Sequence, residues 1–274
     1  MINRRTFLTL AAPFALALSS VATGGTAHAN DSKPSPARSQ TVHITDHGIE
    51  VPAIVTGPVI DLSIHNDGSI AHELAIAQIT PGTTLDQMIG VIGRTEPEPP
   101  FVIADPGGIF LLGPGEHLRY QRQLQPGTYV YFSPAANGSP QLSPAAYQIV
   151  QVTADGHREL PEAERVISLG DNAITLPKLT AGTHRYAITN TGTTPHEVFI
   201  VGVRNPADLD RAADIGAWLD GGQVGPPPVP VHFPGSHQTI DPGVTVVLSL
   251  HLNHATTYAF ADFQTGATTI GSTH

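Results

Sequence analysis

Hydrophobic and polar residues alternate along much of this 274-residue chain. In the segment Val59–His65, VIDLSIH, apolar side chains stand at positions 60, 62 and 64 with polar ones between them. Such alternation predicts β-strands with one buried face, because successive side chains of a strand point to opposite sides. Strands are predicted over 41–44, 48–55, 59–65, 73–79, 108–112, 117–124, 127–133 and 147–152, and then over 165–169, 183–189, 197–203, 238–240, 244–252 and 257–263.

Two segments have helical spacing of their apolar residues instead, 84–93 and 207–219. Many short strands, frequent turn signals and one helix in each half of the chain predict an all-β protein. The expected fold is two tandem Greek-key β-sandwiches, each with one inserted helix. A pair of immunoglobulin-like domains is the alternative, and the helix between mid-chain strands argues against it.

The pattern occurs twice along the chain. The segment LSIHNDGSIAHELAIAQI around His72 corresponds to YAITNTGTTPHEVFIVGV around His196, 124 residues later. A period of this length predicts two tandem domains and not a solenoid, whose repeats are roughly 20–50 residues long. The expected organisation is a first domain over 41–153, a linker over 154–164 and a second domain over 165–274.

The N-terminus has the features of an export signal. Arg4-Arg5 precedes an apolar run, and Ala27-His28-Ala29 forms a small-x-small cleavage site, so residues 1–29 resemble a twin-arginine signal peptide. A general secretory signal is the alternative. Residues 30–40 are expected to form a flexible polar leader. We expect a secreted, extracytoplasmic protein (periplasm or cell exterior) without a membrane span.

Composition narrows the range of partners. The chain has 13 basic and 23 acidic residues, a formal net charge of −10, which disfavours binding to nucleic acid or to anionic membranes. Only 13% of residues are charged, while 27 Gly and 25 Pro are typical of a turn-rich β protein. There is no Cys, so core packing must supply the stability that disulfides give many exported proteins.

The order of motifs resembles the cupredoxin superfamily. Asn66-x-Gly-x-x-x-His72 and Asn190-x-Gly-x-x-x-His196 each follow a predicted strand, and Pro126-Gly-Thr-Tyr129 comes later in the first repeat. The resemblance implies a cupredoxin-like fold in which this His is a copper ligand. It also implies a Cys, a second His and usually a Met, which complete a type 1 copper centre.

The ligands of such a centre are missing. The position of the Cys falls on Ser133 in the first repeat and on Asp262 in the second, and the second His falls near Gln141. A type 1 centre depends on the thiolate, so neither repeat can assemble one. We therefore expect a non-catalytic protein with no cofactor, which acts through binding or structure. A protein partner is compatible with this role, and the sequence does not identify one.

Two alternatives remain. His196, Asp262 and His274 could hold copper(II) or zinc in the second domain, with His72 as a weaker candidate in the first. If no metal is bound there, the expected role of His72 and His196 is to hold the structural turns that begin at Asn66 and Asn190. A multicopper-type oxidoreductase is a remote alternative, because it needs a Cys and His-x-His patterns, and the chain has neither.

The other histidines give weaker signals. His43, His47 and His65 are scattered along early strands. His251 and His254 cannot chelate together on a strand, because residues three apart point to opposite faces. His232 and His237 flank a Pro-Gly loop and are expected to lie on the solvated surface.

Overall fold

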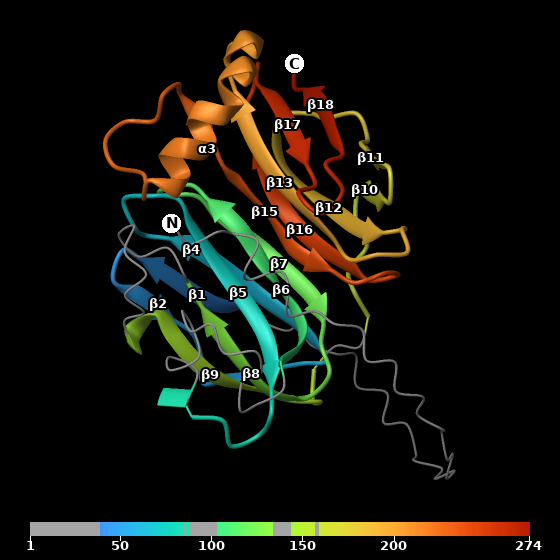
Figure 1. Ribbon diagram of the computed structural model, residues 1–274. Coiled ribbons are helices and arrows are strands. Elements are labelled where there is room, and N and C mark those ends of the chain that lie inside the picture. Colours follow the sequence, from blue (N-terminus) through green and yellow to red (C-terminus); the bar gives the residue numbers. More distant parts are fainter. Residues whose placement is uncertain (1–38, 85, 88–102, 134–143, 157–158) are drawn as a thin grey trace. The chain divides into compact units, whose positions relative to one another are not determined.

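The structure is a computed structural model that describes residues 39–84, 86–87, 103–133, 144–156 and 159–274. All of these residues belong to one unit of the chain, 36–274. The described part is mainly β-structure, so the all-β class predicted from the sequence is confirmed (Figure 1).

The first repeat contributes nine strands to the described part of the chain. They are β1 (Gln40–Thr45), β2 (Gly48–Glu50), β3 (Ile54–Val55), β4 (Val59–Asn66), β5 (His72–Ile79), β6 (Ile103–Leu112), β7 (His117–Gln123), β8 (Gly127–Phe132) and β9 (Tyr147–Val152). A single 3₁₀ turn, η1 (Pro144–Ala146), precedes β9. In β4 the residues at 60, 62 and 64 are buried and those between them are half-buried, as the alternation predicts.

The second repeat follows the same order. Its strands are β10 (Arg165–Gly170), β11 (Ala173–Thr175), β12 (Gly182–Asn190), β13 (His196–Val203), β14 (Val231–His232), β15 (Pro234–Ile240), β16 (Thr245–Leu252), β17 (Thr257–Ala261) and β18 (Thr268–Ser272). The 3₁₀ segment η2 (Pro206–Arg211) leads into the helix α3 (Ala212–Asp220), where the sequence predicts one. Ile215 and Leu219 of α3 pack into a buried cluster with Leu111 and Phe233.

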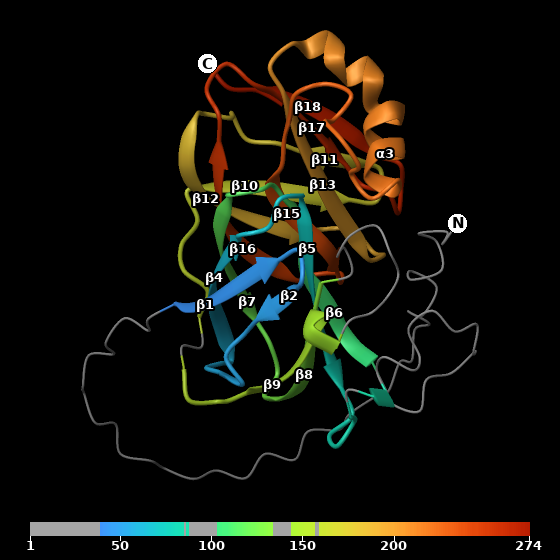
Figure 2. The same ribbon diagram turned by 90° about the vertical axis from the view of Figure 1, so that its left-hand side faces the viewer.

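Both sheets contain strands of both repeats. One sheet has the order β11-β10-β12-β16-β7-β4-β1-β2, and the other has β18-β17-β13-β15-β6-β5-β8-β9-β3. The repeats meet where β16 pairs with β7 and β15 pairs with β6, both antiparallel (Figure 2). The main hydrophobic cluster also joins the repeats, with Tyr120 of the first and Leu248 of the second among its buried members.

The differences from the prediction have local causes. The strand predicted over 48–55 is divided into β2 and β3, with Pro52, which has no N–H to donate to a ladder, between them. Strands β11, β14 and β18 are short and were not predicted. Most of the helix predicted over 84–93 lies outside the described residues. In the described part of the chain, no helix combines the length and apolar character needed to cross a membrane.

Candidate functional site

The duplicated Asn fastens each turn to a neighbouring strand. Asn66 is fully buried. Its Nδ2 donates to the carbonyls of Ile70 at 2.8 Å and Leu112 at 2.7 Å, and its Oδ1 accepts the Gly68 N–H at 2.9 Å. This network satisfies a buried amide and holds the turn in one conformation.

The second repeat reproduces these three bonds. Asn190 Nδ2 donates to Thr194 and Ile240 carbonyls, both at 2.8 Å, and Oδ1 accepts the Gly192 N–H at 2.8 Å. The repetition of side chain, partners and distances accounts for the recurrence of the motif. The two structural turn residues expected from the sequence therefore have the same geometry in both repeats.

The first His of the motif is buried beneath its turn. His72 has no exposed surface, and its Nε2 lies 3.0 Å from Asp46 Oδ1. Asp46 also accepts the Ser69 N–H at 2.9 Å and the Ser69 hydroxyl at 2.7 Å. A Cβ on Gly68 would come within 2.6 Å of both His72 Nε2 and Asp46 Oδ1. The Gly of the motif is therefore needed because the Asp–His pair packs against its Cα.

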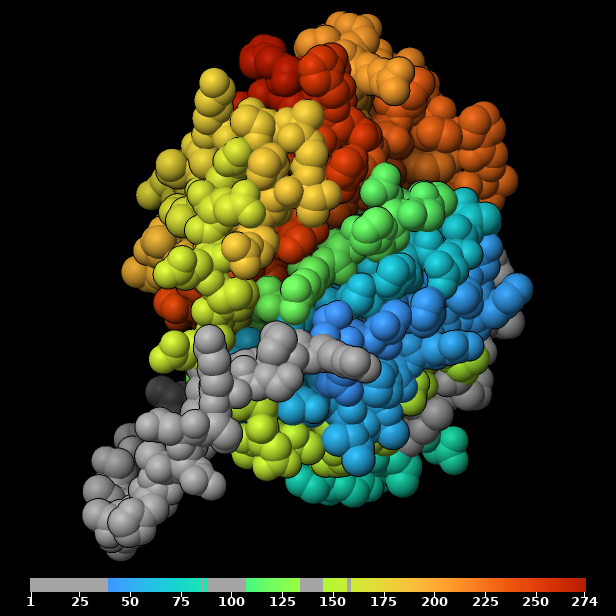
Figure 3. Space-filling model, turned by 180° about the vertical axis from the view of Figure 1, so that it is seen from behind, coloured from blue at the N-terminus to red at the C-terminus, as the bar shows by residue number. Residues whose placement is uncertain are grey.

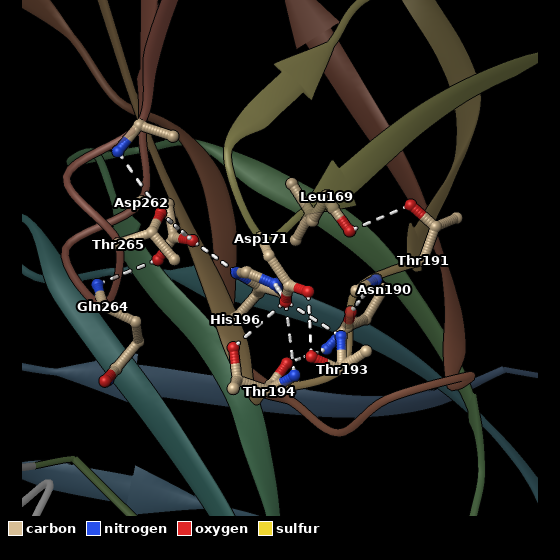
Figure 4. A network of polar contacts seen from close by, with 12 residues as sticks. Leu169, Asp171, Asn190, Thr191, Thr193, Thr194, His196, Asp262, Gln264 and Thr265 are labelled. Carbon is tan, nitrogen blue, oxygen red and sulfur yellow. Dashed lines mark hydrogen bonds and ion pairs between the residues drawn. The ribbon is translucent and has the colours of Figure 1, made fainter.

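His196 lies between two carboxylates (Figure 4). Its Nδ1 is 2.6 Å from Asp262 Oδ2, and its Nε2 is 3.2 Å from Asp171 Oδ1. Asp262 is 1% exposed and also accepts bonds from the Gln264 N–H at 2.9 Å and the Thr265 hydroxyl at 2.8 Å. Each ring nitrogen of His196 thus lies within hydrogen-bond distance of a carboxylate oxygen, one from Asp262 and one from Asp171.

Strand register shows that Ser133 and Asp262 are equivalent. In each repeat, the residue three positions after the His pairs with the last residue of the strand that leads to the expected Cys position. These pairs are Ala75 with Phe132 and Phe199 with Ala261. The next residues along those strands are Ser133 and Asp262, the two positions at which the resemblance implies a Cys.

In the equivalent site of the first repeat, fewer buried polar atoms have a hydrogen-bond partner among the described residues. His72 Nδ1 and Ser133 Oγ are both buried, and neither atom has a hydrogen-bond partner among the described residues. The second repeat fills the corresponding positions with the His196–Asp262 hydrogen bond. The two repeats thus share the turn and the Asp beneath it, and they differ in the group that faces Nδ1.

The carboxylates beneath the turns are held in their charged form. Burial by itself would raise the pKa of Asp46, but hydrogen bonds from His72 and Ser69 outweigh that effect and lower it to about 2. The backbone and side chain of Thr193 hold the pKa of Asp171 well below its usual range, with a further contribution from His196. These groups remain ionised at neutral pH and attract the imidazole beside them.

The predicted metal ligands are only partly together. His196 and Asp262 are in contact, while His274 is exposed and follows β18. In the β17–β18 pair, Thr268 lies opposite Ala261, next to Asp262, and Ser272 lies opposite Thr257 at the other end. His274 is therefore four or more strand residues away from Asp262, about 13 Å or more. No three His, Cys, Asp or Glu side chains of the described residues form a group that could hold a metal ion.

Sequence analysis missed two residues of the site, and it predicted the wrong solvent exposure for two histidines outside the site. Asp46 and Asp171 were not singled out, although each stands at the same place in its repeat. The prediction that His232 and His237 lie on the solvated surface is wrong. His237 is fully buried with Tyr120 Oη at 3.2 Å from its Nε2, and His232 is 12% exposed between Tyr258 and Glu116.

The burial of these two histidines has a structural cause. Strand β15, which carries His237, pairs with β6 of the first repeat, and the Pro-Gly segment is therefore covered and not free. Burial lowers the pKa of His237 to about 3, and the charge of Arg122 adds to that effect. The ring is consequently neutral, and its Nδ1–H donates to the Gln238 carbonyl at 2.6 Å.

The element order of each repeat is the one that the resemblance implied. A strand leads to the Asn-x-Gly turn, a second strand begins at the His, and a later hairpin returns through a Pro-Gly turn to the remaining strands. The fold is cupredoxin-like, and this follows from the order and register of the elements within the described residues.

Several solved structures are similar to the chain. A multicopper oxidase is 12% identical, with 86% of this chain and 89% of that chain covered and a TM-score of 0.26. Auracyanin from Roseiflexus castenholzii is 18% identical, with 41% and 99% covered and a TM-score of 0.29. A copper-containing nitrite reductase from Thermus scotoductus is 11% identical, with 86% and 61% covered and a TM-score of 0.24.

At these identities and TM-scores, the likenesses carry no information on activity. The chain also spans only about three fifths of the nitrite reductase. No family model matches the chain, and no curated protein is similar to it in sequence.

Proposed function

We propose that this protein is a non-catalytic member of the cupredoxin-like fold, in which Asp262 of the second repeat and Ser133 of the first stand where the thiolate ligand of a type 1 copper centre is expected. One observation carries the proposal: both ring nitrogens of His196 face carboxylate oxygens, and one of them belongs to Asp262 at the position of the expected Cys. The protein then acts through its surface, by binding or as a structural component, and not through a redox centre.

The chemistry of the buried groups supports this function. A type 1 centre is defined by a soft thiolate, whereas Asp262 offers a hard oxygen donor that already accepts several hydrogen bonds. A metal ion entering there would have to break those bonds. In the first repeat, Ser133 offers only a neutral hydroxyl. The residues that remain of the motif fasten turns.

The test compares metal affinity with stability in a single variant. His196→Gln is expected to lower the free energy of unfolding, because a buried, doubly bonded side chain is lost. It is expected to leave the affinity of the purified protein for Cu²⁺ and Zn²⁺ unchanged. A His196→Gln protein that stays folded but loses stoichiometric metal binding would contradict the proposal.

A copper(II)- or zinc-binding protein is the second candidate, with His196, Asp262 and His274 as ligands. The observation in its favour is that one nitrogen and one oxygen donor already lie 2.6 Å apart in a buried position. Recruiting His274 requires the C-terminal residues to move from their place beyond β18. Under this candidate, deleting the final residue abolishes binding, whereas the favoured function predicts no effect.

Catalysis and export complete the proposal. A multicopper-type oxidoreductase would oxidise a phenolic electron donor after loading with copper, and we expect no such activity because the chain lacks a Cys to receive electrons. We also propose export by the twin-arginine route, on the basis of Arg4-Arg5. Replacing both with Lys should leave precursor in the cytoplasm, and unchanged secretion would assign the chain to the general route instead.

A further inference from the structure

Strands β9 and β18 occupy equivalent places in the two repeats. Tyr129 of β8 pairs with Val150 of β9, and the corresponding Tyr258 of β17 pairs with Gly271 of β18. Beyond β9 the ten-stranded sheet continues with β3, whereas β18 is its last strand at the opposite end (Figure 1). The first repeat therefore covers a sheet edge that the second repeat leaves open.

Backbone hydrogen bonds hold β3 on the edge of β9. The two strands are parallel, with Ile54 opposite Gln151. The Gln151 N–H donates to the Ala53 carbonyl at 2.9 Å, and the Thr153 N–H donates to the Val55 carbonyl at 3.0 Å. In the first repeat, an extended segment with two β-branched residues thus satisfies the outward groups of the edge strand.

The outward groups of β18 have no backbone partner among the described residues. The Thr273 N–H donates to the Thr256 carbonyl at 3.0 Å, which identifies one bonded pair of the β17–β18 ladder. Bonded pairs alternate along an antiparallel ladder, so the N–H and C=O groups of Thr268, Ile270 and Ser272 point away from β17. An edge of this kind is a template for a further strand.

A cleft lies beside this edge. It has a volume of about 420 Å³ and is lined by residues 176–179, which follow β11, and by Thr269–Ser272 and His274. Leu179 packs against Gly271, where a Cβ would come within 2.6 Å of Leu179 Cδ1. Figure 3 shows this side of the molecule, with the dark red C-terminal residues beside the yellow and gold residues of the segment from β10 to β12. The volume lies in the range of about 300–1,000 Å³ that is usual for ligand sites.

The lining of the cleft indicates the chemistry of an occupant. Leu176 and Pro177 are half-buried and offer apolar contacts, and Ile270 of the edge strand is 61% exposed. Lys178 lines the same cleft and is exposed, so its ammonium group can pair with a carboxylate. An extended segment with apolar, β-branched residues and an acidic residue fits both features.

We propose that β18 binds such a segment of a partner protein, which adds to the ten-stranded sheet in the place that β3 has on β9. Main-chain hydrogen bonds to the outward groups supply affinity, and the contacts with Leu176 and Lys178 supply selectivity. The inference names a surface for the binding role proposed above and therefore rests on it. The metal-affinity test of that role uses His196, so the two proposals can fail separately.

The probe is an end-capped peptide, EVPAIVT, with the sequence of residues 50–56 that contains β3. Nuclear magnetic resonance follows its titration into residues 30–274, and the amide signals of β18 and of residues 176–179 should shift. Without peptide, the amides of Ile270 and Ser272 should exchange rapidly with solvent, whereas those of Thr269 and Gly271, bonded to β17, should be protected. Peptide should slow exchange at Ile270 and Ser272 by about tenfold or more.

Variants test the two sources of binding. Ile270→Pro removes an outward N–H and leaves the bonds to β17 in place, since Pro is tolerated on edge strands where the N–H faces solvent. It should weaken peptide binding by about fivefold or more. Ile270→Val, the matched control, keeps the N–H and should bind like the wild type. Lys178→Gln should weaken binding of EVPAIVT but not of the neutral peptide QVPAIVT, and circular dichroism checks folding.

The proposal is overturned if folded wild-type protein does not bind EVPAIVT, if the peptide shifts amides at another sheet edge, or if Ile270→Pro binds as tightly as Ile270→Val. If Ile270→Pro does not fold, the exchange measurement on the wild type decides. An equal effect of Lys178→Gln on both peptides would overturn the acidic preference. A wild-type chain that dimerises alone, with the Ile270 amide protected only at high concentration, would assign the edge to a second copy instead.

Discussion

Removing the carboxylate of Asp262 should strongly destabilise the protein, while the equivalent change in the first repeat should not. Asp262 accepts hydrogen bonds from His196 Nδ1, the Gln264 N–H and the Thr265 hydroxyl, and it is 1% exposed. In Asp262→Ala, buried His196 loses the carboxylate partner of one ring nitrogen. Breaking a buried pair by removing one member costs about 3–5 kcal/mol, so we expect a loss of that size.

Ser133→Ala is the matched variant, since Ser133 occupies the same ladder position. Its Oγ is buried and has no hydrogen-bond partner among the described residues, so its removal sacrifices no hydrogen bond there. We expect a stability within about 0.5 kcal/mol of the wild type, or slightly above it, because a buried and unsatisfied hydroxyl is also removed. Asp262→Asn, which keeps the shape without the charge, should fall between the two.

Equilibrium unfolding in urea measures these differences. The chain has a single Trp, Trp218 in α3, whose fluorescence reports on the second repeat, and circular dichroism reports on both. With a urea dependence of about 2–3 kcal/mol per molar, a loss of about 3–5 kcal/mol in Asp262→Ala should lower the midpoint by about 1–2.5 M. A midpoint unchanged in Asp262→Ala, or lowered equally in Ser133→Ala, would refute the assignment of the two positions.

Three further predictions follow from the turns and the composition. Gly192→Ala should lower the free energy of unfolding by about 1–3 kcal/mol, because its Cβ would clash with the Asp171–His196 pair, whereas Gly216→Ala in α3, with open space around it, should raise it by about 0.5–1 kcal/mol in the same urea assay. Asp46→Asn should lower the free energy of unfolding by about 1–2 kcal/mol at pH 7, a figure discounted for the partial exposure of Asp46. The difference should fade as the pH drops from 3.8 towards the folded pKa of about 2, because a depressed carboxyl pKa stabilises the fold only while the group is ionised. Urea unfolding series at pH 7 and pH 3 measure this change. The copper(II)-loaded protein should lack an intense absorption band near ~600 nm, since that band arises from a thiolate and the chain has no Cys; a visible spectrum decides this.

Much of the fold could be predicted from the sequence because the same local patterns of apolar and polar residues occur in both repeats. Alternation of apolar and polar residues predicted β4, and helical spacing of apolar residues in the second repeat predicted the segment that forms η2 and α3. Strands β11 and β14, of three and two residues, carry too few residues for alternation to be visible. Their positions depend on pairing with β10 and β13, which is a tertiary property.

The candidate site was predictable in its motif residues but not in their partners. The position count that placed Asp262 where a Cys is expected agrees with the strand register and with the contact to His196. Asp46 and Asp171 were missed because they reach the histidines from a preceding strand hairpin, across a distance that no local pattern encodes. For the same reason the sequence did not show that His43, His65 and His117 lie opposite one another on β1, β4 and β7, which depends on the register of adjacent strands.

At the junction between the repeats, each strand of the first repeat pairs with the equivalent strand of the second: β6 with β15, and β7 with β16. Leu112 and Ile240 accept the same bond from the duplicated Asn, which fixes the correspondence of positions across β6 and β15. In that correspondence Ile109 faces its own equivalent, His237, and Tyr120 faces its equivalent, Leu248. The two repeats are thus related by an approximate two-fold axis between these pairs, which is the symmetry of an isologous homodimer.

A single repeat carries self-complementary edges in β6 and β7. A protein of one repeat could complete both sheets only by associating with a second copy, to an extent that depends on its concentration. Covalent fusion makes that association intramolecular and covers both edges, which removes two templates for unwanted strand addition. Fusion also frees the two halves to diverge, and the Ser133 and Asp262 positions are where the pseudo-symmetry is broken within an otherwise shared site.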